Sequence, residues 1–392
     1  MSKRLFVLLV IMVLTVLPFC WLYAAAAPEA TTRYVAPGGV DGANDCVNPA
    51  NPCGSVVHAV QQTDTGDTVL LAAGWYTETD TIRVFRDMTI QGAGLDQTIV
   101  SVETNPDIWQ VVQVYGEVTA VVSRLTLRNA ERNGVQNLGD LTLTHVNILE
   151  NRGVLGGGGI YNDGVITITD SIIGNNHSSD TAAGMLNFGE ATIQRALFVG
   201  NKAAPFSYGG GLHNQGTAQL ENVTFALNEA GAAPAVSNLG QLTLTNVTIA
   251  QNIGIQPGAT EAAAVINDGT LQAVNTLIAD NGPGRQCDSN TNATITSLGF
   301  NLDSYNGCNF DQPSDLQFAN AQLETFTAVT GTPNWVSPIS FAIGSPALDA
   351  GSADHCPATD ARGVARPIGA GCDIGAYEFD AYQLFLPLLQ KG

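Results

Sequence analysis

The chain has 392 residues, and its 35 acidic against 15 basic side chains give a formal net charge of −20. Only 13% of the residues are charged, about half the share of an average soluble domain, and 45% are hydrophobic. The hydrophobic content argues against an intrinsically disordered chain. The scarcity of basic residues argues against a nucleic-acid partner.

The N-terminus has the order of a secretory signal peptide. A basic start precedes an apolar run over residues 5–23 and a cluster of alanines at 24–27. We expect residues 1–26 to be removed after Ala26, and the mature chain to be secreted or held at the cell surface. An uncleaved anchor is the alternative, and Pro18 within the run argues against it. No later segment is apolar for the roughly 18 residues that a membrane span requires.

Cysteine usage agrees with export, since disulfides form in oxidising compartments. Six cysteines outside the signal allow about 15 pairings, and the sequence alone cannot choose among them. Short loops close most readily, which favours three local pairs. These are Cys46 with Cys53, Cys287 with Cys308, and Cys356 with Cys372. A zinc site is the alternative, but the chain has no Cys-x-x-Cys pair.

Residues 27–80 are expected to form the N-terminal cap and first strands. GDTVLLAAGWYTET, from Gly66, predicts strands, whereas residues 55–62 predict a short helix. A stacked fold leaves its core and strand edges open at each end, so a cap is required there.

Residues 81–283 contain an internal repeat. An asparagine ends each run of alternating apolar residues, at Asn151, Asn176, Asn201, Asn228, Asn252 and Asn281. The spacings between them are 25, 25, 27, 24 and 29 residues. Another asparagine lies 14 residues before each one, at Asn137, Asn162, Asn187, Asn214, Asn238 and Asn267. All variation in length therefore falls in one arc of the repeat.

The pattern within the repeat indicates strands, because apolar and polar residues alternate with period 2. Equivalent positions are apolar throughout, as at Ile148, Ile173, Phe198, Phe225, Ile249 and Ile278. We therefore predict an all-β fold, a single-stranded right-handed parallel β-helix of about 25 residues per coil. It would have a short helical N-terminal cap and an irregular, disulfide-bridged C-terminal cap.

Glycine and asparagine recur at the bends of the predicted coils. Glycines stand two residues after the earlier asparagines, at Gly139, Gly164, Gly189, Gly216, Gly240 and Gly269. We expect left-handed backbone there, since positive φ costs glycine little. The asparagines should stack and hydrogen-bond from coil to coil. Stacking, more than glycosylation, explains the Asn-x-Ser/Thr sequons at Asn176, Asn222 and Asn246.

After the last repeat the period is lost. We assign residues 284–380 to the C-terminal cap and 381–392 to an apolar tail. GSPALDAG from Gly344, CPATDARGVARP from Cys356 and GCDIGAYEF ending at Phe379 resemble the choice-of-anchor Q domain of secreted bacterial β-helix proteins. The repeats are similar to those of polymorphic outer-membrane proteins. The resemblance implies export, a β-helix and surface display, but no reaction.

Catalytic candidates are few. A glycosidase needs two carboxyl groups about 5 to 9.5 Å apart. Asp163 shares an outward column only with Asp268, four coils or about 19 Å away. His145, Asp170 and Arg195 occupy one position in three successive coils and could form an acid–base group with its orienting carboxylate. We favour a charged stack at the bend, because this arc is constant in length.

A binding surface is the better-supported hypothesis. Gln136, Tyr161 and His213 point outward beside the variable arc, with Phe188 close by. Solenoids bind ligands along such extended surfaces, and aromatic and amide side chains suit sugar rings. Scattered surface apolar residues are the alternative.

Three aspartates of the C-terminal cap, Asp349, Asp360 and Asp373, could bind Ca²⁺, which prefers oxygen ligands. We prefer the interpretation that they form turns, and expect no other cofactor.

The sequence therefore predicts an exported, monomeric β-helix that binds an extracellular polysaccharide or a cell-surface glycan without catalysis. One alternative is a polysaccharide lyase or glycoside hydrolase of the pectate-lyase-like type, and the other is a structural envelope protein.

Overall fold

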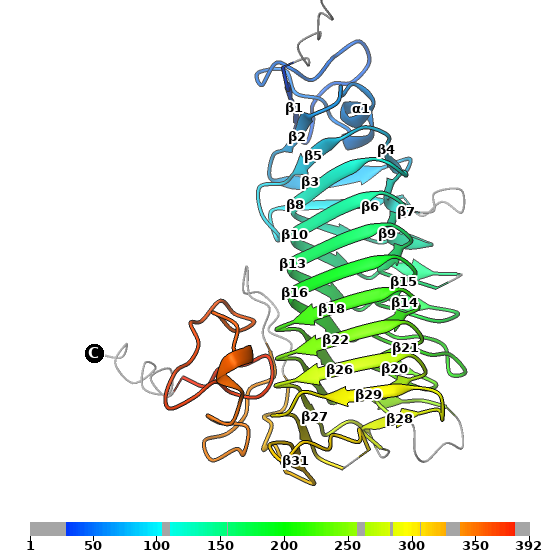
Figure 1. Ribbon diagram of the computed structural model, residues 1–392. Coiled ribbons are helices and arrows are strands. Elements are labelled where there is room, and N and C mark those ends of the chain that lie inside the picture. The colour runs from blue at the N-terminus through cyan, green and yellow to red at the C-terminus, as the bar shows by residue number, and fades with distance from the viewer. Residues whose placement is uncertain are drawn as a thin grey trace, which may run out of the picture.

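The computed structural model describes residues 29–103, 110–154, 156–256, 263–282, 285–305, 307–326 and 338–380. The predicted signal peptide and the predicted apolar tail lie outside these residues. Parallel strands stack coil upon coil into an elongated solenoid (Figure 1). The structure therefore confirms the predicted all-β parallel β-helix.

Three rows of strands run along the solenoid. The first row consists, in order, of β1 (Thr32–Val35), β2 (Asp67–Leu71), β5 (Met88–Gln91), β8 (Thr119–Arg128), β10 (Asp140–Leu149), β13 (Val165–Gly174), β16 (Glu190–Val199), β18 (Thr217–Glu221), β22 (Gln241–Thr245), β26 (Thr270–Val274) and β29 (Thr294–Ser297). The long strands β8, β10, β13 and β16 bend and continue into the second row. The other strands of the second row are β3 (Gly74–Glu78), β6 (Thr98–Val102), β19 (Thr224–Ala226), β23 (Thr248–Ala250), β27 (Leu277–Ala279), β30 (Leu302–Asp303) and β31 (Leu316–Gln317).

The third row is a separate sheet of nine strands. It consists of β4 (Ile82–Val84), β7 (Gln110–Val114), β9 (Asn133–Asn137), β12 (Ile160–Asn162), β15 (Met185–Asn187), β17 (Leu212–Asn214), β21 (Val236–Asn238), β25 (Val265–Asn267) and β28 (Cys287–Ser289). Two short ladders join loops of adjacent coils. They are β11 (Arg152–Gly153) with β14 (His177–Ser178), and β20 (Glu229–Ala230) with β24 (Ile253–Gly254). Parallel pairing thus reaches from Thr32 to Gln317, beyond both ends of the repeat region.

The core consists of stacked like residues, as the apolar columns predicted. Ile148 pairs with Ile173 and Ile173 with Phe198 in successive coils, and all three are buried. The rings of Phe198 and Phe225 stack with their centroids 4.8 Å apart. Burying a side chain of this size contributes roughly 1.5–3 kcal/mol, so the columns stabilise every coil.

The glycine column is not left-handed, so that prediction is wrong. Left-handed residues lie instead at two other bends of each coil. Between rows one and two, φ lies from 47° to 54° at His145, Asp170, Arg195, Asn222, Asn246 and Asn275. After row two, it lies from 52° to 62° at Glu150, Asn175, Gly200, Leu227, Gln251 and Asp280. The glycine column is required by close approach, because a Cβ on Gly189 would lie 2.0 Å from the carbonyl oxygen of Gly164.

The asparagine columns form hydrogen-bonded ladders inside the bends. Asn187 donates from Nδ2 to Oδ1 of Asn214 at 2.7 Å, and the same contact recurs in neighbouring coils. In the other ladder, Nδ2 of Asn176 donates to Oδ1 of Asn201 at 3.0 Å. The sequon residues Asn176, Asn222 and Asn246 are buried, which confirms their structural role.

A short helix covers the N-terminal end of the solenoid. It is α1 (Val56–Gln61), with Ser55 as its N-cap, so the helix predicted at 55–62 is confirmed. The Ser55 hydroxyl accepts from the backbone N–H of His58 at 3.1 Å. The buried carboxylate of Glu78 accepts from the N–H groups of Val56 and Val57, and so satisfies two further donors at the helix start.

The C-terminal region divides into two parts. Cys287, Cys308 and Phe310 are buried at the end of the solenoid, whereas residues 338–380 lie beside its last coils (orange to red in Figure 1). There, Nδ2 of Asn246 donates to the carbonyl oxygen of Asp373 at 3.1 Å. A short 3-10 helix, η1 (Ala353–His355), belongs to this part. Only the first part of the predicted cap therefore covers the end, because the second packs on outward-facing apolar residues of row two and buries them.

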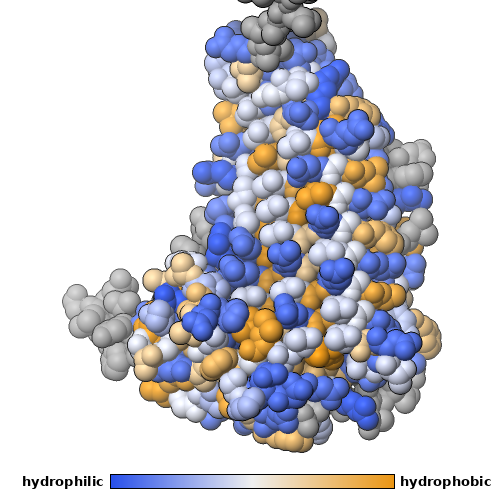
Figure 2. All heavy atoms as spheres, in the orientation of Figure 1, coloured by the Kyte–Doolittle hydropathy of each residue, from blue (hydrophilic) through white to orange (hydrophobic). Residues whose placement is uncertain are grey.

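All three favoured cysteine pairs form disulfides. They are Cys46–Cys53, Cys287–Cys308 and Cys356–Cys372. Within the described residues, no helix is long and apolar enough to cross a membrane. Figure 2 shows the face over row one, where hydrophilic and intermediate residues predominate and the apolar ones are scattered.

Candidate functional site

The outer surface of the third row presents two columns of side chains beside the loops of variable length. Residues on either side of each outward residue point into the core, as the period of 2 requires. The first column reads Arg83, Gln113, Gln136, Tyr161, Leu186, His213, Ser237, Ile266 and Asp288. The second, two residues later, reads Phe85, Tyr115, Leu138, Asp163, Phe188, Gln215, Leu239 and Asp268. We call this surface the third-row strip.

Amide side chains in the N-terminal half of the strip form a network. Oε1 of Gln136 accepts from Nε2 of Gln110 and from Nε2 of Gln113, each at 3.0 Å. Oε1 of Gln113 in turn accepts from the Tyr115 hydroxyl at 3.0 Å. These contacts link the adjacent coils of β7 and β9 and orient polar groups at the surface.

Two aromatic pairs flank this amide network. The rings of Phe85 and Tyr115 stack with centroids 4.2 Å apart and an interplanar angle of 28°. The rings of Tyr161 and Phe188 lie 5.6 Å apart at 49°. Phe85 is 56% exposed and Phe188 38%, so both pairs face solvent. Burial raises the pKa of Tyr161, and the nearby charge of Asp163 adds to the rise. The Tyr161 hydroxyl therefore stays protonated at neutral pH.

Loops cover the first column of the strip at Leu186 and His213. His213, predicted as an exposed binding residue, is only 6% exposed, and its neighbour Leu186 is also buried. The loop at Gly209 packs directly over His213, since a Cβ on this glycine would lie 2.8 Å from the histidine Cβ. Burial lowers the pKa of His213, which favours the neutral ring. The variable loops therefore fold onto the surface here, and the expected placement of His213 is corrected.

The structure shows how the charged side chains of the column at the first bend are arranged. Nε and the Nη2 of Arg195 donate to the two carboxylate oxygens of Asp170 at 2.7 and 2.8 Å. The side-chain hydrogen bond from Asp170 raises the pKa of Arg195, so the arginine stays charged. His145 contacts Thr144 through Nδ1 at 3.2 Å and extends the column by one coil. The arrangement is a bidentate ion pair at left-handed backbone, as expected for a stack at the bend.

Asp163 is exposed at the edge of the strip. Asp268 lies four coils farther along the same column, as the sequence predicted. Hydrolysis by paired carboxylates requires a much shorter separation, so this column does not supply such a pair.

The aspartates Asp349, Asp360 and Asp373 bind backbone N–H groups. Asp349 accepts from the N–H of Ala370 and of Gly371 through Oδ1. Asp360 and Asp373 likewise accept from backbone donors, which is typical of turn-forming aspartates. Turn formation is the preferred interpretation of these residues, and calcium binding stays the alternative.

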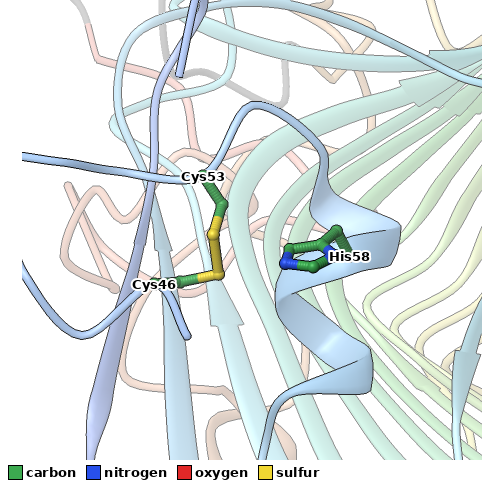
Figure 3. A group of neighbouring side chains, drawn as sticks. All are labelled: Cys46, Cys53 and His58. Carbon is green, nitrogen blue, oxygen red and sulfur yellow. A yellow bond between two sulfur atoms is a disulfide. The ribbon is translucent and has the colours of Figure 1, made fainter. Parts of the chain in front are cut away.

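A histidine lies beside the first disulfide, although the two are not adjacent in the sequence. Figure 3 shows His58 on α1 next to Cys46 and Cys53, and their potential ligand atoms lie within 4.8 Å of one another. The sulfurs are joined in a disulfide, so they do not offer the thiolates that zinc requires. Nε2 of His58 contacts the carbonyl oxygen of Asn44 at 2.8 Å.

Sequence reasoning missed the residues at the N-terminal end of the strip. Arg83, Phe85, Gln113 and Tyr115 precede the regular asparagine spacing, so the repeat did not place them in the outward columns. The period-2 alternation of TIRVF, from Thr81, was the available signal.

No known protein family matches the chain, and no curated protein matches it. The fold is similar to several solved structures. A pectin methylesterase variant in complex with a hexasaccharide shares 9% identity, with a TM-score of 0.34 over 75% of this chain and 95% of that one. The Agl-KA catalytic domain shares 13%, with a TM-score of 0.35 over 70% and 69%.

A third similar structure is the A-module of the mannuronan C-5 epimerase AlgE6 from Azotobacter vinelandii. It shares 15% identity, with a TM-score of 0.33 over 67% of this chain and 92% of that one. Likeness at this level concerns the path of the backbone and leaves function to the residues of the site.

Proposed function

We propose that this protein is an exported β-helix that binds a glycan along the N-terminal half of the third-row strip, without catalysis. One observation supports this most: two exposed aromatic pairs flank a hydrogen-bonded amide network on one straight surface. Three disulfides agree with export, because such bonds persist in oxidising compartments. The choice-of-anchor resemblance agrees with display at a cell surface.

The spacing of the strip suits an extended oligosaccharide. Phe85 and Tyr115 lie in adjacent coils, and so do Tyr161 and Phe188, so the midpoints of the two pairs are three coils apart. At about 4.8 Å per coil this distance is roughly 14 Å. Aromatic rings offer flat apolar faces to the C–H side of a sugar ring, and the amides between them can exchange hydrogen bonds with hydroxyl groups.

The test is a glycan array with the exported protein, followed by titration of each hit. Tyr161→Ala and Phe188→Ala should each weaken binding by about tenfold or more, as expected for aromatic residues at the centre of an interface. Tyr305→Ala, at an exposed tyrosine near the opposite end of the solenoid, is the matched control and should leave affinity unchanged. Absence of any glycan ligand, or equal effects of all three variants, would overturn the proposal.

A further inference from the structure

A pocket lies at the N-terminal end of the third-row strip, between α1 and β4. Its volume is about 270 Å³, and Val57, Val60 and Gln61 line it from the side of the helix. Arg83, Phe85 and Arg86 line the opposite side. Since Arg83 and Phe85 head the two outward columns, the pocket is continuous with the strip.

Two guanidinium groups lie at this pocket. Nη1 of Arg83 donates to Oδ2 of Asp80 at 2.7 Å, which occupies one edge of that guanidinium. Arg86 is exposed, and within the described part of the chain it has no hydrogen-bond or ion-pair partner. Its neighbour Asp87 is directed elsewhere, since Oδ1 accepts from the backbone N–H of Thr119 at 2.8 Å. Arg86 is therefore free to bind an anion.

The charge of the whole chain makes this arrangement informative. A net charge of −20 disfavours the approach of anions, so an anionic group is expected to bind where arginines line a common site. Guanidinium groups match carboxylates in shape and can bind them through two parallel hydrogen bonds. Phe85, stacked on Tyr115, supplies a flat apolar wall beside the two arginines.

We infer that the pocket binds the carboxylate of a uronic acid at one end of the glycan, with its ring against Phe85. The inference rests on the proposed function and narrows it to acidic polysaccharides. Arg86 would pair with the carboxylate, while the amides and the second aromatic pair would bind the following sugars. The ligand would then lie along the solenoid axis with one orientation, fixed by its acidic residue at the α1 end.

The test compares oligogalacturonate and oligomannuronate with the same oligosaccharides after reduction of their carboxyl groups to primary alcohols. The acidic forms should bind about tenfold more tightly than the reduced forms, and this preference should decrease as salt is added. Arg86→Gln should abolish the preference by weakening binding of the acidic forms to the level of the reduced forms. Arg285→Gln, at an exposed arginine near the other end of the solenoid, is the control of equal charge change and should have no effect.

The outcomes separate the two proposals. Equal affinity for acidic and reduced forms, unaffected by Arg86→Gln, would overturn the pocket assignment and leave glycan binding by the strip intact. Equal loss with Arg86→Gln and Arg285→Gln would indicate a general charge effect and would also overturn it. If no acidic or neutral glycan binds, and Tyr161→Ala changes nothing, the proposed function itself fails.

Discussion

At the scale of single residues, the packing and hydrogen bonding of a solenoid residue depend on the equivalent residue one coil away. Gly189 shows this dependence, because its Cα hydrogen faces the carbonyl of Gly164 across the stacking interface. Asn187 shows it as well, since its amide is satisfied by Asn214 in the next coil. At these bend positions the short distance between coils therefore decides which residue fits. The local backbone conformation matters less.

This close approach predicts the effect of adding one methyl group. Gly189→Ala would place a Cβ 2.0 Å from the carbonyl oxygen of Gly164, so the coils must separate. We expect the free energy of unfolding to fall by about 1–3 kcal/mol or more, the usual cost of overpacking. Urea unfolding followed by circular dichroism measures the change.

Gly116 provides a matched control for this substitution. Its φ is not positive, and an added Cβ would meet its nearest neighbour, the carbonyl oxygen of Leu138, at an ordinary 3.7 Å. Gly116→Ala should therefore change the free energy of unfolding by less than about 1 kcal/mol. Similar losses for the two variants would contradict the close-approach explanation.

At the scale of elements, the second part of the C-terminal region depends on the first bend of the last coils. Asn222 donates to the carbonyl oxygen of Thr359 at 2.8 Å, and Asn275 accepts from the N–H of Ser352 at 2.7 Å. The column that holds the Asp170–Arg195 ion pair therefore continues as a row of asparagines, and these asparagines bind the C-terminal part by hydrogen bonds. Apolar contacts add to it, with Leu197, Ala226 and Ala250 packed against Phe326, Ile339, Ala361 and Ala376.

A buried ionic cluster lies within this docked part. Nη1 of Arg366 lies 3.4 Å from the Glu378 carboxylate, and both side chains are fully buried. Arg366 also donates to the carbonyl oxygen of Asp373 at 3.0 Å. The carboxylate of Asp373 accepts from the N–H of Asp349 and of Phe379. Removing any one member would leave a buried charge or acceptor without its partner, which is costly.

The pKa of Asp373 predicts how pH affects this part of the protein. Burial raises that pKa to about 7, well above the ordinary value of 3.8 that applies in the unfolded chain. Between these two values the folded state binds the extra proton, so stability falls as pH rises through this window. Above about pH 7 the contribution is constant, because both states are then ionised.

Asp373→Asn should remove this contribution to the pH dependence. We expect hydrogen exchange of residues 338–380 to accelerate from about pH 5 to about pH 8 in the natural protein, after correction for intrinsic rates, and less so in the variant. Asp96→Asn, at an exposed aspartate, is the control and should keep the natural profile. An unchanged profile in Asp373→Asn would show that this carboxyl is not responsible.

At the scale of the whole molecule, the protein is a one-dimensional stack in which each coil contacts its neighbours. Its two ends are therefore the places where core and strand edges would otherwise meet water. The N-terminal end depends on α1, which Glu78 holds through the N–H groups of Val56 and Val57 and through the Ser55 hydroxyl.

Glu78→Gln tests how far a local defect spreads along the stack. The amide replaces one acceptor oxygen by a donor that faces the helix N–H groups, so we expect α1 to loosen. Hydrogen exchange should accelerate in residues 32–78, whereas β16 to β27 should keep their protection because several coils separate them from the cap. Glu190→Gln, at an exposed glutamate, should change neither region, and acceleration along the whole solenoid would contradict the nearest-neighbour view.

Much of the fold could be predicted from the sequence because the interactions repeat. The asparagine spacing, the apolar columns and the helix at residues 55–62 each follow from a local pattern, and the structure confirms them. The left-handed bends at Asp170 and its equivalents could not be predicted in this way. Charged and amide residues occur there in place of glycine, since their polar side chains tolerate the conformation and bond across coils.

The candidate site was only partly predictable. Gln136, Tyr161 and Phe188 were identified as outward residues, because alternation alone decides which side of a strand faces solvent. Whether such a residue is open depends on the loop above it, and for His213 that loop closes the surface. Arg83 and Arg86 belong to irregular early coils, so only the folded chain brought them beside α1.

The sequence alone determined the stacking, since every coil repeats the same short-range pattern of core, bend and ladder. Only the tertiary structure decided which parts of that stack stay open, because covering depends on contacts between segments far apart in the chain. The C-terminal part docked on Asn246 makes such a contact. The helix beside Arg83 and the loop over His213 cover the surface in the same way from nearer in the chain. Although the chain is acidic as a whole, a basic site lies at that helix, where the guanidinium of Arg86 is near the exposed ring of Phe85.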